Sequence, residues 1–180
     1  RAFRGKTDAV TVRLLREADG IVLGKTNIPQ TLIAIETTNH IYGTCNNPWA
    51  LERTPGGSSG GEAAALASGQ SVLGVGTDIG GSIRIPAGYT ATVGLKPTLG
   101  EVSVDGVVPL SRTLDHIGPL AQSVPDASLV YHPLLGDVSA KPPAPQPTHG
   151  MRLPLPRPSS LARLSARLPP RSQRPPPPHP

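Results

Sequence analysis

Two glycine-lined serine runs are the residues of this chain best suited to attack a carbonyl group. The first is Gly56-Gly57-Ser58-Ser59-Gly60-Gly61, and the second is Gly80-Gly81-Ser82. A serine hydroxyl that attacks a carbonyl creates an oxyanion, which preorganised backbone N–H groups stabilise. Adjacent glycines allow unusual φ values and carry no Cβ, so the backbone can approach a substrate closely. The second run therefore offers a nucleophile and hydrogen-bond donors within a few residues.

The first run is a weaker signal by itself, because an isolated Gly/Ser run is typical of a flexible linker. Two observations favour a functional role. The helix-forming stretch Glu62-Ala63-Ala64-Ala65-Leu66 follows it at once, and Ser58 lies 24 residues before Ser82 with one helix–strand unit between them. That spacing can bring both loops to the same edge of a sheet, where active sites often gather.

A serine nucleophile needs a base, and histidine is the usual one. Three of the five histidines lie in or near proline-rich sequence and are unsuited: His132, His149 and His179. His40 and His116 remain, but nothing in the sequence places either beside Ser82. Both are therefore predicted to be structural or surface residues, and the base must be sought elsewhere.

The charge and composition of the chain change near residue 140. Residues 1–140 hold 10 Lys+Arg and 12 Asp+Glu, whereas residues 141–180 hold 7 Lys+Arg, no acid and 14 of the 23 prolines. Proline removes an N–H and fixes φ, so we predict a partial globular domain over 1–137 and a disordered Pro/Arg-rich tail over 138–180. A proline-motif ligand and an out-of-frame gene end are the alternatives for the tail. Because residues 1–140 show no basic stripe and few aromatics, no specific nucleic-acid partner is expected.

The sequence also predicts where the protein works. It shows no signal peptide and no run of roughly 18 apolar residues, so we expect no membrane partner. The single cysteine, Cys45, cannot form an internal disulfide, which favours a reducing cytoplasm. Nothing near Cys45 activates its thiol, so an incidental role is expected.

Strands and helices alternate along residues 8–135, which indicates an α/β architecture. We expect a helix over 8–18 capped by Asp8, a left-handed exit at Gly20 and a short buried strand over 21–24. A helix over 60–68 and a strand over 71–76 should follow, and the strand leads directly into the second serine run. Pro86 can begin a short helix, and 124–135 reads as a further helix.

Several ordered motifs resemble those of the amidase-signature family over roughly residues 8–137. They are Gly24-Lys25-Thr26-Asn27, Asn46-Asn47-Pro48-Trp49, the first serine run with Glu62, the stretch from Gly76 to Ala87 that contains Thr77-Asp78-Ile79-Gly80-Gly81-Ser82-Ile83-Arg84, then Gly94-Leu95-Lys96-Pro97-Thr98 and Leu114-Asp115-His116-Ile117-Gly118-Pro119. The resemblance implies an α/β fold in which helices cover a mixed β-sheet.

The resemblance also implies a Ser–cis-Ser–Lys triad. Ser82 would be the nucleophile, and Ser58, which follows a cis peptide bond in the family, would be the bridging serine. A neutral lysine would take a proton from Ser58, which takes one from Ser82, and water would then cleave the acyl-enzyme. The oxyanion hole would be formed by the N–H groups of Ile79, Gly80, Gly81 and Ser82, with support from Ser59, Thr77, Asp78 and Arg84. No metal or organic cofactor is implied.

The sequence departs from the family at the lysine. That residue belongs to a motif upstream of the helix at 8–18, and neither Lys6 nor Lys25 stands in it. Loss of one member of a catalytic unit can cost as much as about 10⁶-fold, so this chain is expected to be nearly inactive.

Three functions stay open at this point. The first is hydrolysis of a small-molecule linear amide, with the particular amide and the oligomeric state unreadable. The second is that of the related A subunit of a glutaminyl- or asparaginyl-tRNA amidotransferase, although Asp105-Gly106-Val107-Val108-Pro109 before Leu114 looks more like the hydrolases. The third is a non-catalytic remnant or binding module.

An α/β-hydrolase elbow is disfavoured. Gly57-Ser58-Ser59-Gly60-Gly61 does match the G-x-S-x-G pattern of such an elbow. However, Arg53-Thr54-Pro55 precedes it where that fold has a buried strand. A phosphate-binding loop is disfavoured as well, because no Gly-Lys-Ser/Thr closes the glycine run.

Overall fold

The computed structural model describes residues 5–137, and the predicted tail over 138–180 lies outside the described residues. The described part is an α/β arrangement, in agreement with the predicted fold class. Its larger sheet has three strands in the order β3-β5-β4 and is antiparallel throughout. The strands are β3 (Leu73–Asp78), β4 (Val93–Gly94) and β5 (His116–Ala121). In the register of β3 and β5, Leu73 faces Ala121 at one end and Asp78 faces His116 at the other.

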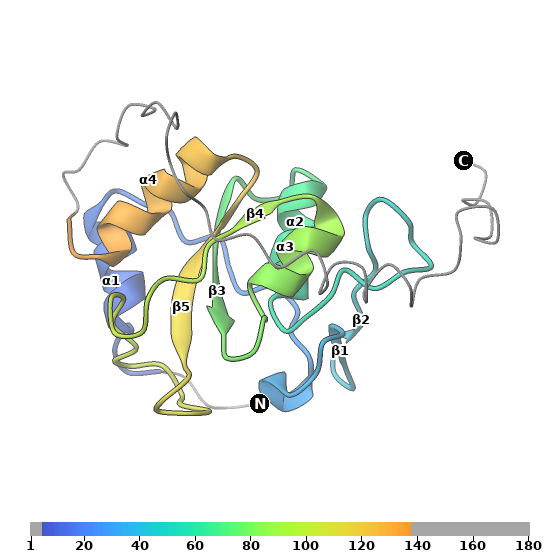
Figure 1. The fold of residues 1–180 in the computed structure, drawn as a ribbon, viewed down its shortest axis with the longest axis horizontal. Coiled ribbons are helices and arrows are strands. Elements are labelled where there is room, and N and C mark those ends of the chain that lie inside the picture. The colour runs from blue at the N-terminus through green and yellow to red at the C-terminus, as the bar shows by residue number, and fades with distance from the viewer. Residues whose placement is uncertain (1–4, 138–180) are drawn as a thin grey trace, which may run out of the picture. The chain divides into compact units, whose positions relative to one another are not determined.

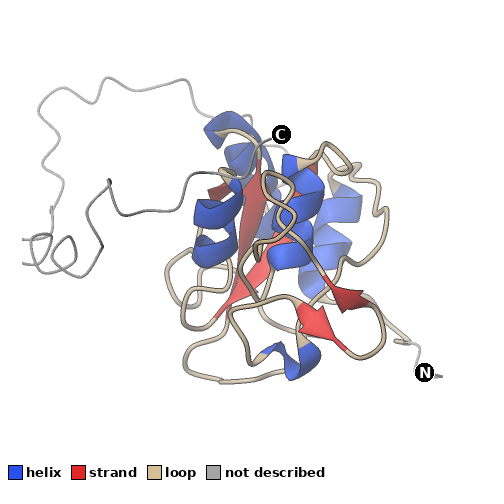
Figure 2. Ribbon diagram, turned by 90° about the vertical axis from the view of Figure 1, so that its right-hand side faces the viewer, coloured by secondary structure: helices blue, strands red, loops and turns tan. Residues whose placement is uncertain are grey.

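Helices cover both faces of this sheet. On one side lie α2 (Gly60–Ala67) and α3 (Arg84–Thr90), and on the other lie α1 (Val10–Glu17) and α4 (Val124–Leu134) (Figure 1). The view in Figure 2 shows the strands between the helices, with a separate hairpin below them. That hairpin is formed by β1 (Thr38–Asn39) and β2 (Gly43–Thr44), and a short 3₁₀ turn, η1 (Gln30–Leu32), precedes it.

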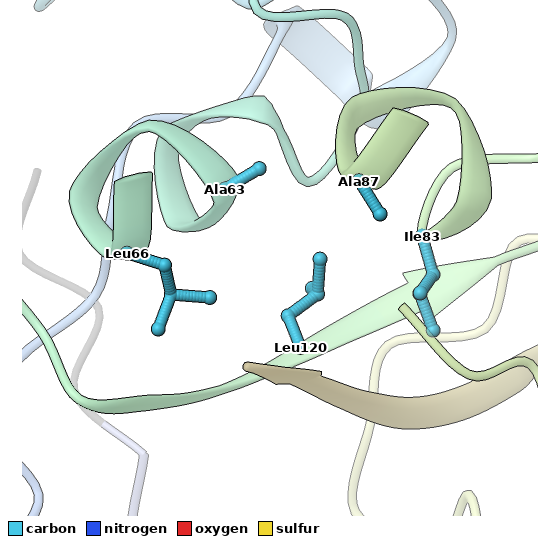
Figure 3. Close-up of a cluster of buried hydrophobic side chains, with 5 residues drawn as sticks. All are labelled: Ala63, Leu66, Ile83, Ala87 and Leu120. Carbon is cyan, nitrogen blue, oxygen red and sulfur yellow. The ribbon is translucent and has the colours of Figure 1, made fainter. Parts of the chain in front are cut away.

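Each face of the sheet carries its own apolar cluster, because successive side chains of a strand point to opposite faces. Leu120 of β5 is fully buried against the α2 and α3 side, in the cluster that Figure 3 shows. Ile117 of the same strand packs on the opposite side. The first cluster consists of Ala63, Leu66, Ile83, Ala87 and Leu120, and the second of Val102, Ile117, Val130 and Leu134. The helix α2, rich in small residues, can therefore lie close to the sheet directly behind the first serine run.

Most of the expected elements are confirmed. The helices predicted over 8–18, 60–68 and 124–135 appear as α1, α2 and α4, and a helix does begin near Pro86 as α3. The strand predicted over 71–76 appears as β3, shifted toward the second serine run by two residues. None of the described helices combines the length and the apolar character needed to cross a membrane.

Three local predictions are wrong. Residues 21–24 form no strand, and Ile21 is 86% exposed, because no described segment pairs with them and an unpaired strand is not stable. Asp8 does not cap α1, whose N-cap is Ala9. The carboxylate of Asp8 instead forms an ion pair with Arg16 at 2.9 Å. The left-handed residue after α1 is Asp19, at φ 61°, and not Gly20. Aspartate visits this region more readily than most residues.

Candidate active site

The first serine run forms a tight loop that ends at the start of α2. The Gly57–Ser58 peptide bond is cis, as the resemblance implies, and Gly56 has a φ of 83° that favours glycine. The hydroxyl of the buried Thr37 donates to the carbonyl oxygen of Gly56 at 2.8 Å. A Cβ on Gly57 would approach the backbone carbon of Ile35 to 2.9 Å. The loop is therefore held by the segment that contains Ile35 and Thr37.

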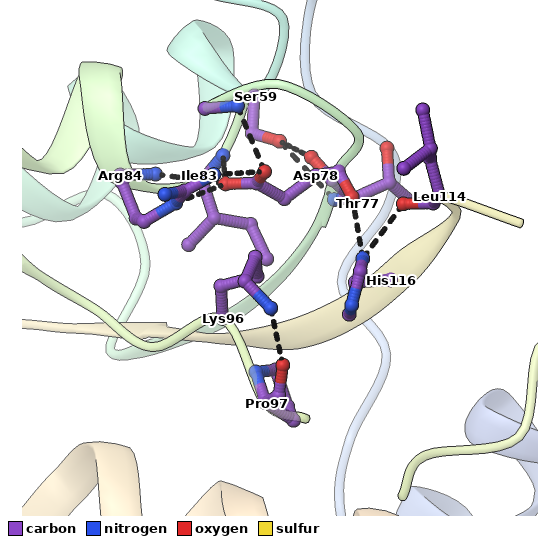
Figure 4. A network of polar contacts seen from close by, with 10 residues as sticks. Ser59, Thr77, Asp78, Ile83, Arg84, Lys96, Pro97, Leu114 and His116 are labelled. Atoms are coloured by element: carbon purple, nitrogen blue, oxygen red, sulfur yellow. Dashed lines mark hydrogen bonds and ion pairs between the residues drawn. The ribbon is translucent and has the colours of Figure 1, made fainter. Parts of the chain in front are cut away.

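A backbone hydrogen bond joins the two serine runs directly. The N–H of Ser59 donates to the carbonyl oxygen of Ser82 at 3.1 Å. The hydroxyl oxygen of Ser59 also lies 3.3 Å from both the N–H and the carbonyl oxygen of Thr77, the residue before Asp78 on β3. Figure 4 shows the contacts between Ser59 and Thr77 at the end of the strand. The loop before α2 and the loop after β3 are thus one connected unit.

Asp78 organises the second loop from within. It is fully buried, and its carboxylate accepts hydrogen bonds from backbone and side chain alike (Figure 4). These donors are the N–H groups of Gly81, Ile83 and Arg84 at 2.8, 3.1 and 3.4 Å, and the Arg84 Nε and Nη2 atoms at 3.0 and 2.8 Å. The carboxylate therefore wraps the turn from 79 to 84 around itself.

Electrostatics favour the charged form of Asp78. Burial alone would raise the pKa of Asp78, but the hydrogen bonds from Arg84 and from the backbone of Ile83 and Gly81 outweigh it, so the pKa lies below its usual value. Arg84 gains from the same pair, since the hydrogen bond to Asp78 raises the pKa of its guanidinium. The side chain of Arg84 is 52% exposed, so it closes the network at the surface.

The two candidate hydroxyls belong to the two loops that the Ser59–Ser82 hydrogen bond joins. Ser58 is buried at 3% exposure, and Ser82 is half-buried. Neither hydroxyl is hydrogen-bonded to another group in the described part of the chain. Because Gly81 donates its N–H to Asp78, the N–H groups at this turn without a protein acceptor among the described residues belong to Ile79, Gly80 and Ser82.

No described group is hydrogen-bonded to the serine hydroxyls as a base would be. Of the described lysines, Lys96 directs its Nζ to the carbonyl oxygen of Pro97 at 2.5 Å, and neither Lys6 nor Lys25 is hydrogen-bonded to Ser58. His116 lies closer to the site than the sequence suggested, because its ring contacts the carbonyl oxygen of Asp78. Within residues 5–137, no group of three His, Cys, Asp or Glu side chains could hold a metal ion.

The thiol of Cys45 lies in an environment that does not activate it. Burial raises the pKa of Cys45, which disfavours the reactive thiolate.

Sequence reasoning misses two residues of this site. Thr37 holds the first loop from 19 positions upstream of Gly56, and an isolated threonine gives no signal for such a contact. Gly76 stands out in the sequence only as part of a motif. A Cβ there would approach the Ser59 hydroxyl oxygen to 2.6 Å, so this glycine makes room for the junction between the loops. Its position inside a strand could have pointed to a close approach of another backbone.

Comparison with known proteins identifies the family of this arrangement. The Amidase family model matches residues 1–164. The A subunit of a glutamyl-tRNA(Gln) amidotransferase from Corynebacterium diphtheriae is 50% identical over 129 residues, which are 72% of this chain and 26% of that protein. A crystal structure of an amidase superposes with a TM-score of 0.70 at 46% identity, covering 72% of this chain and 30% of the amidase. The native peptide amidase of Stenotrophomonas maltophilia gives 0.69 at 42% identity, covering 72% of this chain and 27% of that enzyme.

The chain thus spans about a quarter of the length of the curated relatives that it matches. The family model extends over both serine loops and the Asp78 turn. These matches, over more than half of the chain, show that the chain belongs to the amidase family.

Proposed function

We propose that this protein hydrolyses a linear carboxylic amide through an acyl-enzyme formed on Ser82. The hydrogen bond from Ser59 N–H to Ser82 C=O carries the proposal, because it holds the two serine loops together at one end of β3. Ser82 is half-buried and its hydroxyl is not engaged by another described group, so it can approach a substrate carbonyl. Ser58, on the adjacent loop, would pass the proton of Ser82 on to a lysine.

The oxyanion would be stabilised by peptide N–H groups at the turn after β3. We assign this role to Ile79, Gly80 and Ser82, whose N–H groups have no acceptor among the described residues, and we give Gly81 a share only if its bond to Asp78 loosens. Preorganised donors in a water-poor site usually contribute the largest part of amide-cleaving catalysis. Asp78 and Arg84 would keep these donors in place, and Ser59 and Thr77 would set the spacing between the loops.

The proton acceptor of Ser58 would be a lysine that the described residues do not supply. None of the described lysines reaches either serine by a hydrogen bond, so we expect the chain of 180 residues to turn over simple amides very slowly. An assay of ammonia release from short-chain primary amides measures this. Ordinary turnover by the purified chain would contradict the triad as we assign it.

Binding of a transition-state mimic tests the nucleophile without requiring turnover. An alkyl trifluoromethyl ketone forms a hemiketal with an accessible active-site serine, and ¹⁹F NMR detects the adduct. We expect the unmodified chain and Ser68→Ala, a change at the exposed far end of α2, to form the adduct. Ser82→Ala should form none. An adduct that persists in Ser82→Ala would remove Ser82 from its proposed role.

A second candidate function is that of the A subunit in a tRNA-dependent amidotransferase. It is favoured by the names of the curated relatives, which are A subunits of glutamyl-tRNA(Gln) amidotransferases at 47–50% identity. The two functions differ in their need for a partner. Hydrolysis of simple amides by the longest product of the gene, in the absence of any partner protein, would support the amidase.

A non-catalytic remnant is the remaining alternative. It predicts that the chain folds but forms no Ser82-dependent adduct with the ketone. For the compartment we propose a reducing cytoplasm, on the basis of the single cysteine.

A further inference from the structure

We propose that His116 is a positioning residue for the oxyanion hole, because its imidazole fixes the peptide group that carries the N–H of Ile79. This inference rests on the proposed amide hydrolysis and adds to it a residue from a different strand. Asp78 is the last residue of β3, and its partner in the register of β5 is His116, the first residue of that strand. The residue that carries the imidazole therefore lies directly opposite the point where β3 ends and the second serine loop begins.

The imidazole contacts two carbonyl oxygens with one nitrogen. Its Nδ1 lies 2.6 Å from the carbonyl oxygen of Leu114 and 3.2 Å from that of Asp78. A carbonyl oxygen can only accept a hydrogen bond, so Nδ1 must carry the hydrogen and share it between both. Figure 4 shows the ring below the end of β3, joined to Leu114 and to the strand by these contacts. The side chain of His116 is partly buried. Its contact with Asp78 is partly buried as well, whereas its contact with Leu114 is exposed.

The contact with Asp78 determines where the next N–H points. The carbonyl of Asp78 and the N–H of Ile79 belong to one planar peptide, and in a trans peptide they point in opposite directions. Among the described residues only the Gly57–Ser58 bond is cis. Since the carbonyl of Asp78 points toward His116 on β5, the N–H of Ile79 points toward the other edge of β3.

That other edge is the one at which the serine loops meet. The N–H and the carbonyl oxygen of Thr77 both contact the Ser59 hydroxyl oxygen there. Ser59 in turn binds Ser82. The imidazole thus holds the peptide from the side away from the substrate, while the N–H of Ile79 stays directed at the reacting carbonyl.

The Asp78 carboxylate cannot replace this contact. It binds the N–H groups of Gly81, Ile83 and Arg84 and leaves the peptide between Asp78 and Ile79 to other groups. The imidazole of His116 therefore holds the start of the turn, and the carboxylate of Asp78 holds its middle.

Four variants of the 180-residue chain test the proposal. His116→Asn places an amide N–H near the position of Nδ1 and should preserve the clamp, whereas His116→Leu removes the donor and His116→Gln places its N–H further out. His40→Leu, a change at an exposed histidine in the β1–β2 hairpin, is the matched control. Thermal unfolding of each variant identifies any that fails to fold.

The first measurement is the ¹⁵N–¹H resonance and hydrogen-exchange rate of the Ile79 amide. We expect both to change in His116→Leu and His116→Gln, and to stay near those of the parent chain in His116→Asn and His40→Leu. The amides of Gly81 and Ile83, held by Asp78, should move little in any variant. An unchanged Ile79 amide in folded His116→Leu would overturn the inference, and if that variant does not fold, His116→Gln gives the same reading.

The second measurement is affinity for the alkyl trifluoromethyl ketone. Deleting an oxyanion donor costs roughly 10² to 10³-fold in rate, so a misdirected donor should weaken hemiketal formation by about 10-fold in His116→Leu. His116→Asn should restore the affinity, and binding of the matching amide, which forms no oxyanion, should not change. Parental affinity in His116→Leu would overturn the positioning role while leaving the proposed function intact. If the parent chain forms no Ser82-dependent adduct, the proposed function itself fails and the inference with it.

Discussion

The backbone N–H of Ser59 donates to the carbonyl oxygen of Ser82 at 3.1 Å, and this bond ties the loop before α2 to the loop after β3. Two further contacts bring the loops together. The hydroxyl of Ser59 contacts the backbone of Thr77 on β3, and Asp78 then folds the chain back so that Ser82 returns to Ser59. A change in either loop should therefore be felt in the other, and the following predictions use this coupling.

Asp78→Asn should destabilise the domain by about 2–4 kcal/mol, because the amide would turn an NH₂ group toward donors that now share a carboxylate. Denaturant unfolding of the two proteins measures the difference. Asp19→Asn is the control, since that residue is exposed at φ 61°, where asparagine is well tolerated. Equal losses in both variants would show that the buried network contributes no special stability.

Stability should fall in acid through the titration of Asp78. Its pKa is lower in the folded chain than in the unfolded chain, so the unfolded chain binds the proton first as the pH drops. The contribution is fully present above the unfolded value of about 3.9 and is lost as the pH falls through the lower folded pKa. The unfolding free energy should be measured from about pH 6 to about pH 2. It should show this loss in the parent chain and a smaller loss in Asp78→Asn.

Gly76→Ala should disturb the junction between the loops. The new Cβ would come 2.6 Å from the Ser59 hydroxyl oxygen and 2.7 Å from Leu120, so both must move. Overpacking of this kind costs roughly 1–3 kcal/mol. Gly24→Ala is the matched control, because nothing lies within 4 Å of its Cβ. Loss of the Ser82 ketone adduct in a folded Gly76→Ala variant, but not in Gly24→Ala, would confirm the coupling.

Leu120→Ala should cost about 2–5 kcal/mol, since it empties the centre of the cluster between α2, α3 and β5. Leu99→Ala, at a residue that is 54% exposed, should change the unfolding free energy by less than about 1 kcal/mol. Thermal or denaturant unfolding measures both. A similar cost at the two leucines would mean that the cluster does not support the sheet as described.

The sequence predicts local features of the fold better than features that depend on distant segments. The helix α2 and the strand β3 follow from composition and spacing within each segment, and both are confirmed. The prediction of a strand over 21–24 is wrong because it depends on residues outside that segment. Its apolar residues suit a strand, but strand formation needs a partner, and no described segment pairs with it.

The candidate site shows the same division. The glycine and serine pattern points to Ser58 and Ser82, since a close backbone approach and a hydroxyl are both written in the local sequence. The sequence offers no role for His116, because no spacing argument relates it to a loop 34 positions away. Only the β3–β5 register, which places it opposite Asp78, gives it one.

By itself, the sequence determined the chemistry on offer: hydroxyls, peptide donors freed by glycine, and an aspartate close to an arginine. These depend on residue type and on φ and ψ preferences that act over a few positions. The tertiary structure decided which groups meet, which N–H groups stay free and which way the Ile79 peptide points. Those outcomes depend on hydrogen bonds between segments that packing alone brings together, and no local preference encodes them.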